Sequence, residues 1–175
     1  MKSGNYHRQH LRAPYKQELL FEDEGFVFKA ATLNISEGGI LLDALPHFPS
    51  KEKVALMLTL PQIPILRNFT LEKLQSFSPE VFPQKVIRLK CQMVRKETDT
   101  TNVDDVFKSR IGAKFTEIYK MKQRLIADYV DRFSTNLIYM QILLDTLQSE
   151  PNQLPKLRKM SEILGYDQDA KVAQI

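Results

Sequence analysis

Apolar and polar residues alternate along several short stretches before residue 117, and this pattern predicts β-strands. A period of two residues is typical of a strand with one face in the core and one face in water. The predicted strands span residues 15–21, 25–33, 40–44, 53–60, 85–97 and 107–115. Because turn-forming residues separate them, the sequence predicts a mainly β chain with α-helices: a small six-stranded antiparallel β-barrel followed by a long C-terminal helix and a shorter helix.

Inward-facing positions follow from the alternation. In the strand at 53–60 they are Val54, Leu56, Leu58 and Leu60, and Met57 breaks the strict pattern in a way compatible with a covered outer face. Other expected inward residues are Tyr15, Leu19 and Phe21 in the first strand and Phe26, Phe28, Ala30 and Thr32 in the second. The single cysteine, Cys91, lies in an alternating run and is expected to be a buried small apolar residue.

Residues 61–84 interrupt the strand pattern. Their prolines at positions 61, 64, 79 and 83 exclude a regular strand throughout, and Thr70 is a suitable N-cap for a short helix over residues 70–77. The segment is too apolar for a free loop, with Ile63, Ile65, Leu66, Phe69, Leu71, Leu74, Phe77, Val81 and Phe82. It either folds back over the barrel or meets a partner, and we favour the first.

A helical pattern begins at residue 117 and continues to residue 148 without glycine or proline. Its apolar residues recur every four and three positions, as in a heptad seam: Ile126, Val130, Phe133, Leu137, Met140, Leu144 and Leu147. The first turns are expected to pack on the barrel. For the rest, either a shorter helix at 154–164, ended by Gly165, packs back on the first, or residues 126–147 join copies of the chain into a homo-oligomer. The two arrangements are compatible.

These patterns divide the chain into three parts. Residues 1–118 are expected to form the barrel with an N-terminal arginine arm and the 61–84 insertion, residues 119–165 a helical extension, and residues 166–175 a tail.

The composition, 43% hydrophobic and 26% charged over 175 residues, is typical of a folded soluble chain. A net charge of +4, mixed with acidic residues, is too mild for a nucleic-acid-binding arm.

Several classes of protein are disfavoured by what the sequence lacks. No apolar run reaches the ~18 residues of a membrane span, and the polar N-terminus has no signal-peptide pattern, so we expect a cytoplasmic protein. His7, His10 and His47 are the only histidines, and we expect no metal site because His7 and His10 have no third ligand nearby. No nucleophile elbow, phosphate loop or carboxylate pair is visible, so we expect no enzyme.

Two polar stretches are candidates for function. Asn34-Ile35-Ser36-Glu37-Gly38-Gly39 separates two apolar runs and is expected to turn between antiparallel strands, where Asn and Gly are favoured because they tolerate positive φ. Asn34 and Ser36 would then cap local backbone groups. Arg8 and Arg12 precede the first strand, and their planar guanidinium groups suit phosphates and a guanine edge.

Together, Arg8-x-x-x-Arg12 and Asn34-x-Ser36-x-x-Gly39 resemble the two-part signature of the PilZ domain family, which binds cyclic di-GMP. The resemblance covers residues 8–118. It includes Arg12-Ala13-Pro14-Tyr15, which leads into a strand, and residues 110–115, which look like the last barrel strand of the family with its Gly-x-x-Phe element.

The resemblance implies that cyclic di-GMP is the ligand of this chain. Its binding residues would be Arg8, Arg12, Asn34, Ser36, Gly38 and Gly39, with His7 and Gln9 as weaker candidates. The arginine arm would fold over the barrel when the ligand arrives. The arm and the nucleotide together would then offer a surface to an unidentified protein partner.

Two alternatives belong to other classes of protein. A PilZ-like adaptor would work through the C-terminal helices without any ligand. A small basic barrel that binds single-stranded nucleic acid would need aromatic residues on one face within a basic groove. Tyr15, Phe26 and Phe28 are available, but they alternate inward, so we expect no DNA binding.

Overall fold

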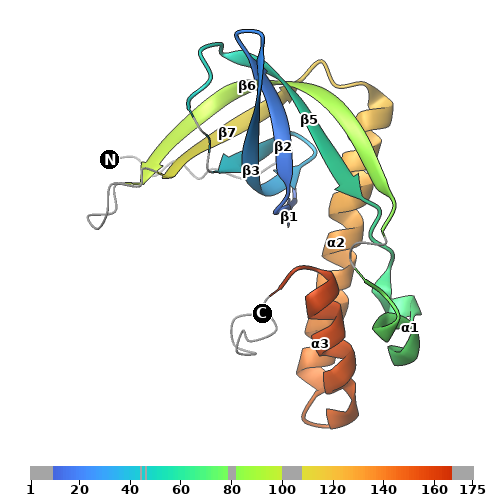
Figure 1. Ribbon diagram of the computed structural model, residues 1–175. Coiled ribbons are helices and arrows are strands. Elements are labelled where there is room, and N and C mark those ends of the chain that lie inside the picture. Colours follow the sequence, from blue (N-terminus) through green and yellow to red (C-terminus); the bar gives the residue numbers. More distant parts are fainter. Residues whose placement is uncertain (1–9, 44, 46, 79–81, 100–107, 167–175) are drawn as a thin grey trace. The chain divides into compact units, whose positions relative to one another are not determined.

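The computed structural model describes residues 10–43, 45, 47–78, 82–99 and 108–166 (Figure 1). The chain divides into two compact units, one formed by Met1–Leu60 and Lys85–Val130 and the other by Pro61–Gln84 and Asp131–Ile175. This division differs from the expected one, because the 61–84 segment clusters with the C-terminal helices. Residues 1–9 of the predicted arm and all but the first residue of the tail predicted at 166–175 lie outside the described residues.

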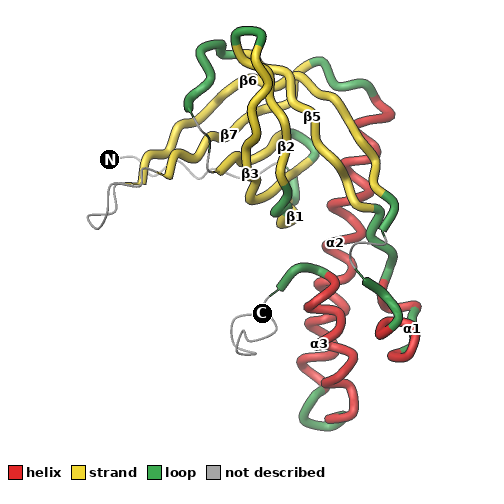
Figure 2. The backbone as a smooth tube through the Cα atoms, viewed as in Figure 1, coloured by secondary structure: helices red, strands yellow, loops and turns green. Residues whose placement is uncertain are grey.

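The first unit is a closed β-barrel, drawn in yellow in Figure 2. Its strands are β1 (Arg12–Pro14), β2 (Glu18–Asp23), β3 (Phe26–Ser36), β4 (Gly39–Asp43), β5 (Lys53–Pro61), β6 (Gln84–Asp99) and β7 (Lys108–Thr116). Six of them follow the order β3–β2–β5–β6–β7–β4, and the pairing of β4 with β3 closes the ring. The predicted six-stranded antiparallel barrel is confirmed, with β1 as an additional strand that pairs with the last residues of β3.

Inward side chains fill the barrel largely as the alternation predicts. Val54, Leu56, Leu58 and Leu60 are all buried, whereas Met57 between them is 37% exposed. Tyr15, Leu19 and Phe21 are buried as well. Cys91 is also buried, and this burial raises the pKa of its thiol to about 12.

The second predicted strand departs from its pattern at its first residue. Ala30 and Thr32 are buried and Phe28 is half-buried, but Phe26 is 68% exposed. Phe26 directly follows the hairpin turn formed by Glu24 (φ 50°) and Gly25 (φ 82°), where the hairpin extends beyond the core. Two successive residues with positive φ are typical of a tight hairpin turn.

The first turns of the long helix α2 (Lys120–Thr146) pack on the barrel, as predicted. Ile126, Tyr129 and Val130 are buried. The Tyr129 hydroxyl donates to the Pro14 carbonyl at 2.8 Å, and its ring meets the Tyr15 ring edge-on with the centroids 5.9 Å apart. This contact joins α2 to the end of β1.

The second unit contains residues 131–146 of α2 together with η1 (Leu66–Asn68), α1 (Leu71–Gln75), η3 (Pro151–Gln153) and α3 (Leu154–Ile163). Asn136 is fully buried in α2. Its side chain accepts a hydrogen bond from the Leu66 backbone N–H at 2.8 Å and donates one to the Pro64 carbonyl at 2.9 Å. The 61–84 segment is therefore fixed to the helix, a position that the sequence analysis did not consider.

The sequence signals for the start of α1 and for the end of α3 are confirmed. Thr70 precedes α1 and its hydroxyl accepts from the Lys73 N–H at 3.4 Å. After α3, Gly165 has a φ of 77°, and the Tyr166 N–H donates to the Ser161 carbonyl at 2.9 Å. These are the features of a Schellman motif, which ends a helix at glycine.

The shorter helix packs back on the long one, as one interpretation predicted. Lys156 of α3 donates to the Tyr139 hydroxyl of α2 at 3.0 Å, and Leu157 and Met160 are buried. Four residues of the predicted heptad seam are buried within the chain: Ile126, Val130, Phe133 and Met140. Association of copies through residues 126–147 stays a prediction. No helix in the described part of the chain is long and apolar enough to cross a membrane.

Candidate functional site

β1 brings the second arginine of the arm beside the Asn-x-Ser motif. In the antiparallel pairing of β1 and β3, Arg12 lies opposite Ser36 and Pro14 lies opposite Asn34. The Arg12 guanidinium donates to the Asn34 side-chain oxygen at 3.4 Å, at the long end of a hydrogen bond. Two predicted site residues that are 22 positions apart are therefore neighbours on one face of the barrel. Arg8, His7 and Gln9 lie outside the described residues.

A β-bulge sets the direction of the Asn-x-Ser side chains. The pairing of β3 with β4 shifts between Thr32 and Asn34, so that Leu33 has no residue directly opposite. Both Thr32 and Ile35 are buried, although they are three positions apart. An extra residue reverses the alternation of a strand. Asn34 and Ser36 consequently face outward, on the same side as Arg12.

The connection between β3 and β4 consists of Glu37 and Gly38 only. The Ser36 hydroxyl donates to the Gly39 carbonyl at 3.2 Å and closes this short turn, and Ser36 is only 7% exposed. The turn-capping role expected for Ser36 is therefore present. The turn itself is shorter than the six residues of the motif, because β3 continues through Ser36.

Neither motif glycine has a positive φ, contrary to the sequence-based expectation, and Gly39 is instead required by a close backbone contact. Among the described glycines, positive φ occurs at Gly25 and Gly165. A Cβ on Gly39 would lie 2.4 Å from the Ala113 carbonyl oxygen of β7. A Cβ on Gly38 would lie 2.9 Å from the His10 imidazole. Gly39 thus allows two backbones to approach, whereas Gly38 lies under a side chain that can move.

Two residues near the motif were not identified from the sequence. His10 lies between the two arginines of the arm, and its ring covers Gly38. Lys114 of β7 lies opposite Gly39 of β4 and is exposed. The alternation of residues 111–115 could have placed Lys114 outward, but only the strand pairing shows that it lies beside the motif.

Together these residues form a polar face on the barrel, defined here as Arg12, Asn34, Ser36, Gly39 and Lys114. It offers two cations from different strands and one amide that can donate and accept hydrogen bonds. Between them lies a glycine, which has no side chain to fill the surface. Such an arrangement suits a flat ligand with anionic groups. In the part of the chain that the structure describes, no group of three or more His, Cys, Asp or Glu side chains could hold a metal ion.

A second polar cluster contains serine, histidine and aspartate but lacks the order of a catalytic triad. Asp23 accepts from the Ser50 hydroxyl at 2.8 Å through Oδ1 and from the Ser50 N–H at 2.9 Å through Oδ2, and His47 Nε2 lies 3.2 Å from the same Oδ2. The backbone hydrogen bond from Ser50 is the main reason that the pKa of Asp23 falls to about 2. Because Ser50 donates to Asp23, the cluster fixes a loop and does not present a nucleophile to a base.

Comparisons with known proteins agree with this fold. A family model described as PilZ domain matches residues 6–132, well over half of the chain. No curated protein matches. Among solved structures, the Bacillus subtilis inhibitor of motility (MotI/DgrA) aligns with a TM-score of 0.54 and 20% sequence identity, over 74% of this chain and 52% of that one. The chain thus spans about half the length of MotI/DgrA.

Two further solved structures align less closely. The PilZ domain of YcgR from Escherichia coli with c-di-GMP gives a TM-score of 0.47 at 9% identity, over 73% of this chain and 91% of that one. PlzA from Borreliella burgdorferi, in complex with c-di-GMP, gives 0.44 at 8% identity, over 72% of this chain and 51% of that one. The likeness to MotI/DgrA concerns the fold, and the family model, which matches more than half of the chain, leads to one conclusion. This chain belongs to the PilZ domain family.

Proposed function

We propose that this chain is a receptor for cyclic di-GMP that acts by binding and not by catalysis. The observation that carries the proposal is the pairing of β1 with β3, which places Arg12 opposite Ser36 and in contact with Asn34. Cyclic di-GMP has two phosphodiester groups and two guanine bases. The polar face offers cationic and amide groups for both kinds of contact.

Each residue of the proposed site has a distinct task. Arg12, together with Arg8 of the arm, would contact phosphates and guanine edges, while Asn34 would hydrogen-bond to a guanine. Lys114 would add a second cation from the opposite side of Gly39. Gly38 and Gly39 would leave room for a base. Ser36 would hold the turn and would use its remaining hydrogen-bonding capacity to contact the edge of the nucleotide. His7 and Gln9 remain weaker candidates.

The existing contact between Arg12 and Asn34 is weak enough to be exchanged for contacts to a ligand. At 3.4 Å and exposed to water, it contributes little to stability. A ligand that offers phosphate oxygens to Arg12 and a base edge to Asn34 would gain more from both groups than they gain from each other. Binding would in this way order the arm over the barrel, and the new surface would be read by a protein partner.

The test is calorimetric titration with cyclic di-GMP. We expect the wild type to bind and an Arg8→Ala/Arg12→Ala variant to bind at least ~100-fold more weakly, since charged hydrogen bonds contribute about 1.5–3 kcal/mol each. An Arg124→Ala/Lys120→Ala variant, which loses two charges from exposed positions of α2, should bind like the wild type.

The absence of binding heat from the wild type, with an unchanged melting temperature at saturating nucleotide, would reject the receptor proposal. The alternative would then be a ligand-independent adaptor that acts through its C-terminal helices. A cytoplasmic location and a homo-oligomer remain part of the proposal.

A further inference from the structure

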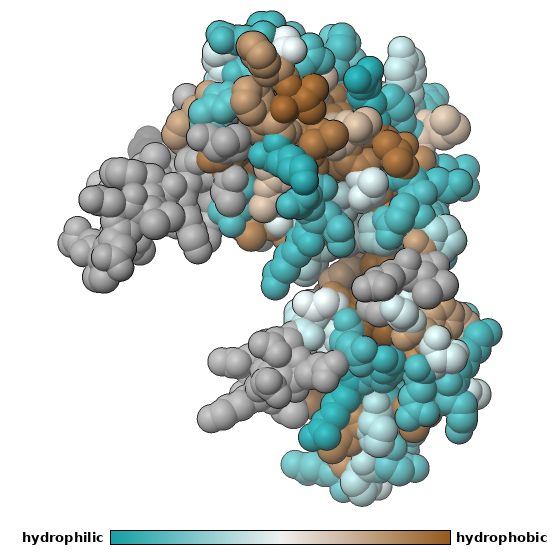
Figure 3. Space-filling model, viewed as in Figure 1, coloured by the Kyte–Doolittle hydropathy of each residue, from teal (hydrophilic) through white to brown (hydrophobic). Residues whose placement is uncertain are grey.

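One part of the outer barrel surface is apolar although strand faces in contact with water are usually polar. On β3, β5 and β6 the outward residues Val27, Met57 and Val86 are 65%, 37% and 64% exposed. Figure 3 shows hydrophobic side chains gathered over this part of the sheet. This apolar face is defined here as Leu20, Val27, Ala55, Met57 and Val86, with Glu22 and Arg88 among them.

The strand pairing places the members of this face in adjacent rows. Glu22 of β2 lies opposite Val27 of β3 on one side and opposite Ala55 of β5 on the other. Leu20 lies opposite Met57 in the next row. The apolar residues therefore lie on four neighbouring strands around Glu22, and the exposed Lys29, opposite Leu20, borders them on β3.

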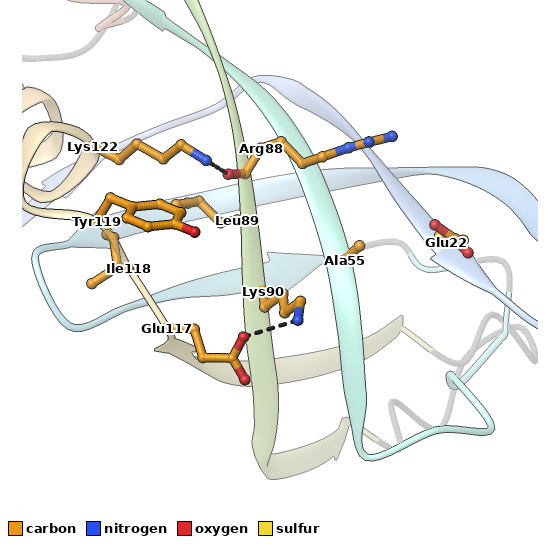
Figure 4. A pocket seen from close by; sticks show the side chains of 9 residues that line it. All are labelled: Glu22, Ala55, Arg88, Leu89, Lys90, Glu117, Ile118, Tyr119 and Lys122. Carbon is orange, nitrogen blue, oxygen red and sulfur yellow. Dashed lines mark hydrogen bonds and ion pairs between the residues drawn. The ribbon is translucent and has the colours of Figure 1, made fainter.

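The short side chain of Ala55 leaves a hollow in the middle of the face. Two adjoining hollows, of about 670 Å³ and 70 Å³, share Glu22, Ala55 and Arg88 as lining residues. Figure 4 shows the residues that line the larger one. The larger continues to the exposed Tyr119, and the smaller is lined by Val27 and Met57. A groove of this kind, lined by both apolar and charged side chains, suits a protein surface better than a compact small molecule.

Most charged groups around the groove are already engaged. Lys90 and Glu117 form an ion pair at 2.9 Å, which raises the pKa of Lys90 and lowers that of Glu117. Lys122 donates to the Arg88 backbone carbonyl at 2.6 Å. Glu22 and the Arg88 guanidinium are different, because neither has an ion-pair partner among the residues that the structure describes. The groove thus has one free anion and one free cation.

These two charges come from the strands on either side of Ala55, Glu22 from β2 and Arg88 from β6, and the Arg88 side chain extends across β5 in Figure 4. A face with an apolar centre and opposite charges on its two sides is complementary to itself. When two copies meet around a twofold axis near Ala55, Glu22 of each copy faces Arg88 of the other. Symmetric dimers are built from such self-complementary patches.

We propose that two copies of this chain associate through the apolar face, with two symmetric Glu22–Arg88 ion pairs around a centre formed by Ala55 and Met57. This interface is distinct from the helical seam, in which Ile126, Val130, Phe133 and Met140 are already buried within one chain. The inference does not depend on nucleotide binding. It identifies the second copy as the occupant because the chain itself carries the matching charges.

Sedimentation velocity over a concentration series tests the dimer directly. We expect the wild type to dimerise. In the variants Arg88→Glu and Glu22→Arg, like charges would face each other twice per dimer, which should raise the dissociation constant by ~100-fold or more. Arg124→Glu, a charge reversal at an exposed position of α2 outside this face, should leave the dimer intact.

Mixing the two variants gives the decisive result. An Arg88→Glu copy and a Glu22→Arg copy restore both ion pairs between them, so the mixture should form a heterodimer although neither variant dimerises alone. Because each variant serves as the partner of the other, recovery also shows that both are folded. The proposal would be overturned if the wild type stayed monomeric or if the mixture of variants did not associate. It would also be overturned if the dimer were lost only in Ile138→Glu/Ile142→Glu.

Discussion

The polar face and the apolar face lie on the same barrel and obey the same alternation, yet they differ in every property that matters for binding. On the polar face, outward residues are cationic, amide or glycine, and strands approach closely at Gly39 and Ala113. On the apolar face, outward residues other than Glu22 and Arg88 are aliphatic, and the short side chain of Ala55 lines the hollow. The inward residues beneath both faces are the same kind of aliphatic core.

This difference shows how one barrel can carry two surfaces independently. The core depends on inward residues, so that outward residues are free to vary as long as the strand pairing is kept. The polar face places small and charged groups where a flat anion can reach them. The apolar face exposes area that is stabilised only when another surface covers it. We therefore expect substitutions on one face to leave the function of the other unchanged.

The largest effect on this comparison should come from Gly39→Ala. Its Cβ would lie 2.4 Å from the Ala113 carbonyl oxygen, so β4 and β7 must separate. Overpacking of this kind costs about 1–3 kcal/mol in the free energy of unfolding. Gly38→Ala is the matched control, because its Cβ meets only the movable His10 ring, and we expect a change within about 0.5 kcal/mol. Equal losses in urea unfolding of both variants would contradict the distinction.

Acid should weaken the hydrogen bonds by which Asp23 holds the connection between β4 and β5. The pKa of Asp23 lies at about 2 in the folded chain, below its ordinary value of 3.8, so its contribution to stability is complete above that ordinary value. This contribution is lost as the pH falls through about 2. Melting temperatures of the wild type and of Asp23→Asn should therefore differ at neutral pH and converge over this acidic range. A constant difference would show that the Asp23 carboxylate is not the titrating group.

Lys114 should have a moderate effect that is confined to the polar face. Lys114→Gln removes one cation beside Gly39, and we expect cyclic di-GMP to bind about 5–10-fold more weakly, or about 1–1.4 kcal/mol. The dependence of affinity on salt should also become less steep. Lys85→Gln, at an exposed position of β6, is the control and should change neither quantity. An unchanged affinity in Lys114→Gln would restrict the site to the motif residues.

Local sequence signals predicted much of the fold. The Thr70 cap, the Gly165 stop and the inward residues of β5 depend on neighbours within a few positions, and all three are confirmed. The motif arginine and asparagine were also identified, because their residue types and order carry the family resemblance. What brings Arg12 to Asn34, however, is the short strand β1, which has only three residues and no alternation to detect.

Features that depend on pairing between distant strands could not be predicted from one sequence. The bulge at Leu33, the contact of Gly39 with Ala113 and the position of Lys114 each require the register of two strands. The placement of residues 61–84 on α2 requires Asn136, a polar residue within an apolar helical pattern. Its only signal was its position, three residues after Phe133 and four before Met140, which is the spacing of the buried face of a helix.

The smallest effect on stability and on nucleotide binding should come from the apolar face. Met57→Gln replaces an outward side chain that is 37% exposed, and we expect the free energy of unfolding to change by no more than about 0.5 kcal/mol. Leu56→Ala, one position away but facing the core, should cost about 2–5 kcal/mol. Affinity for cyclic di-GMP should stay within about twofold of the wild type in Met57→Gln, because the polar face is formed by other strands. Self-association should weaken in the same variant, so that one substitution separates the two faces. If nucleotide affinity fell together with self-association, the faces would be coupled, and the barrel would not carry them independently.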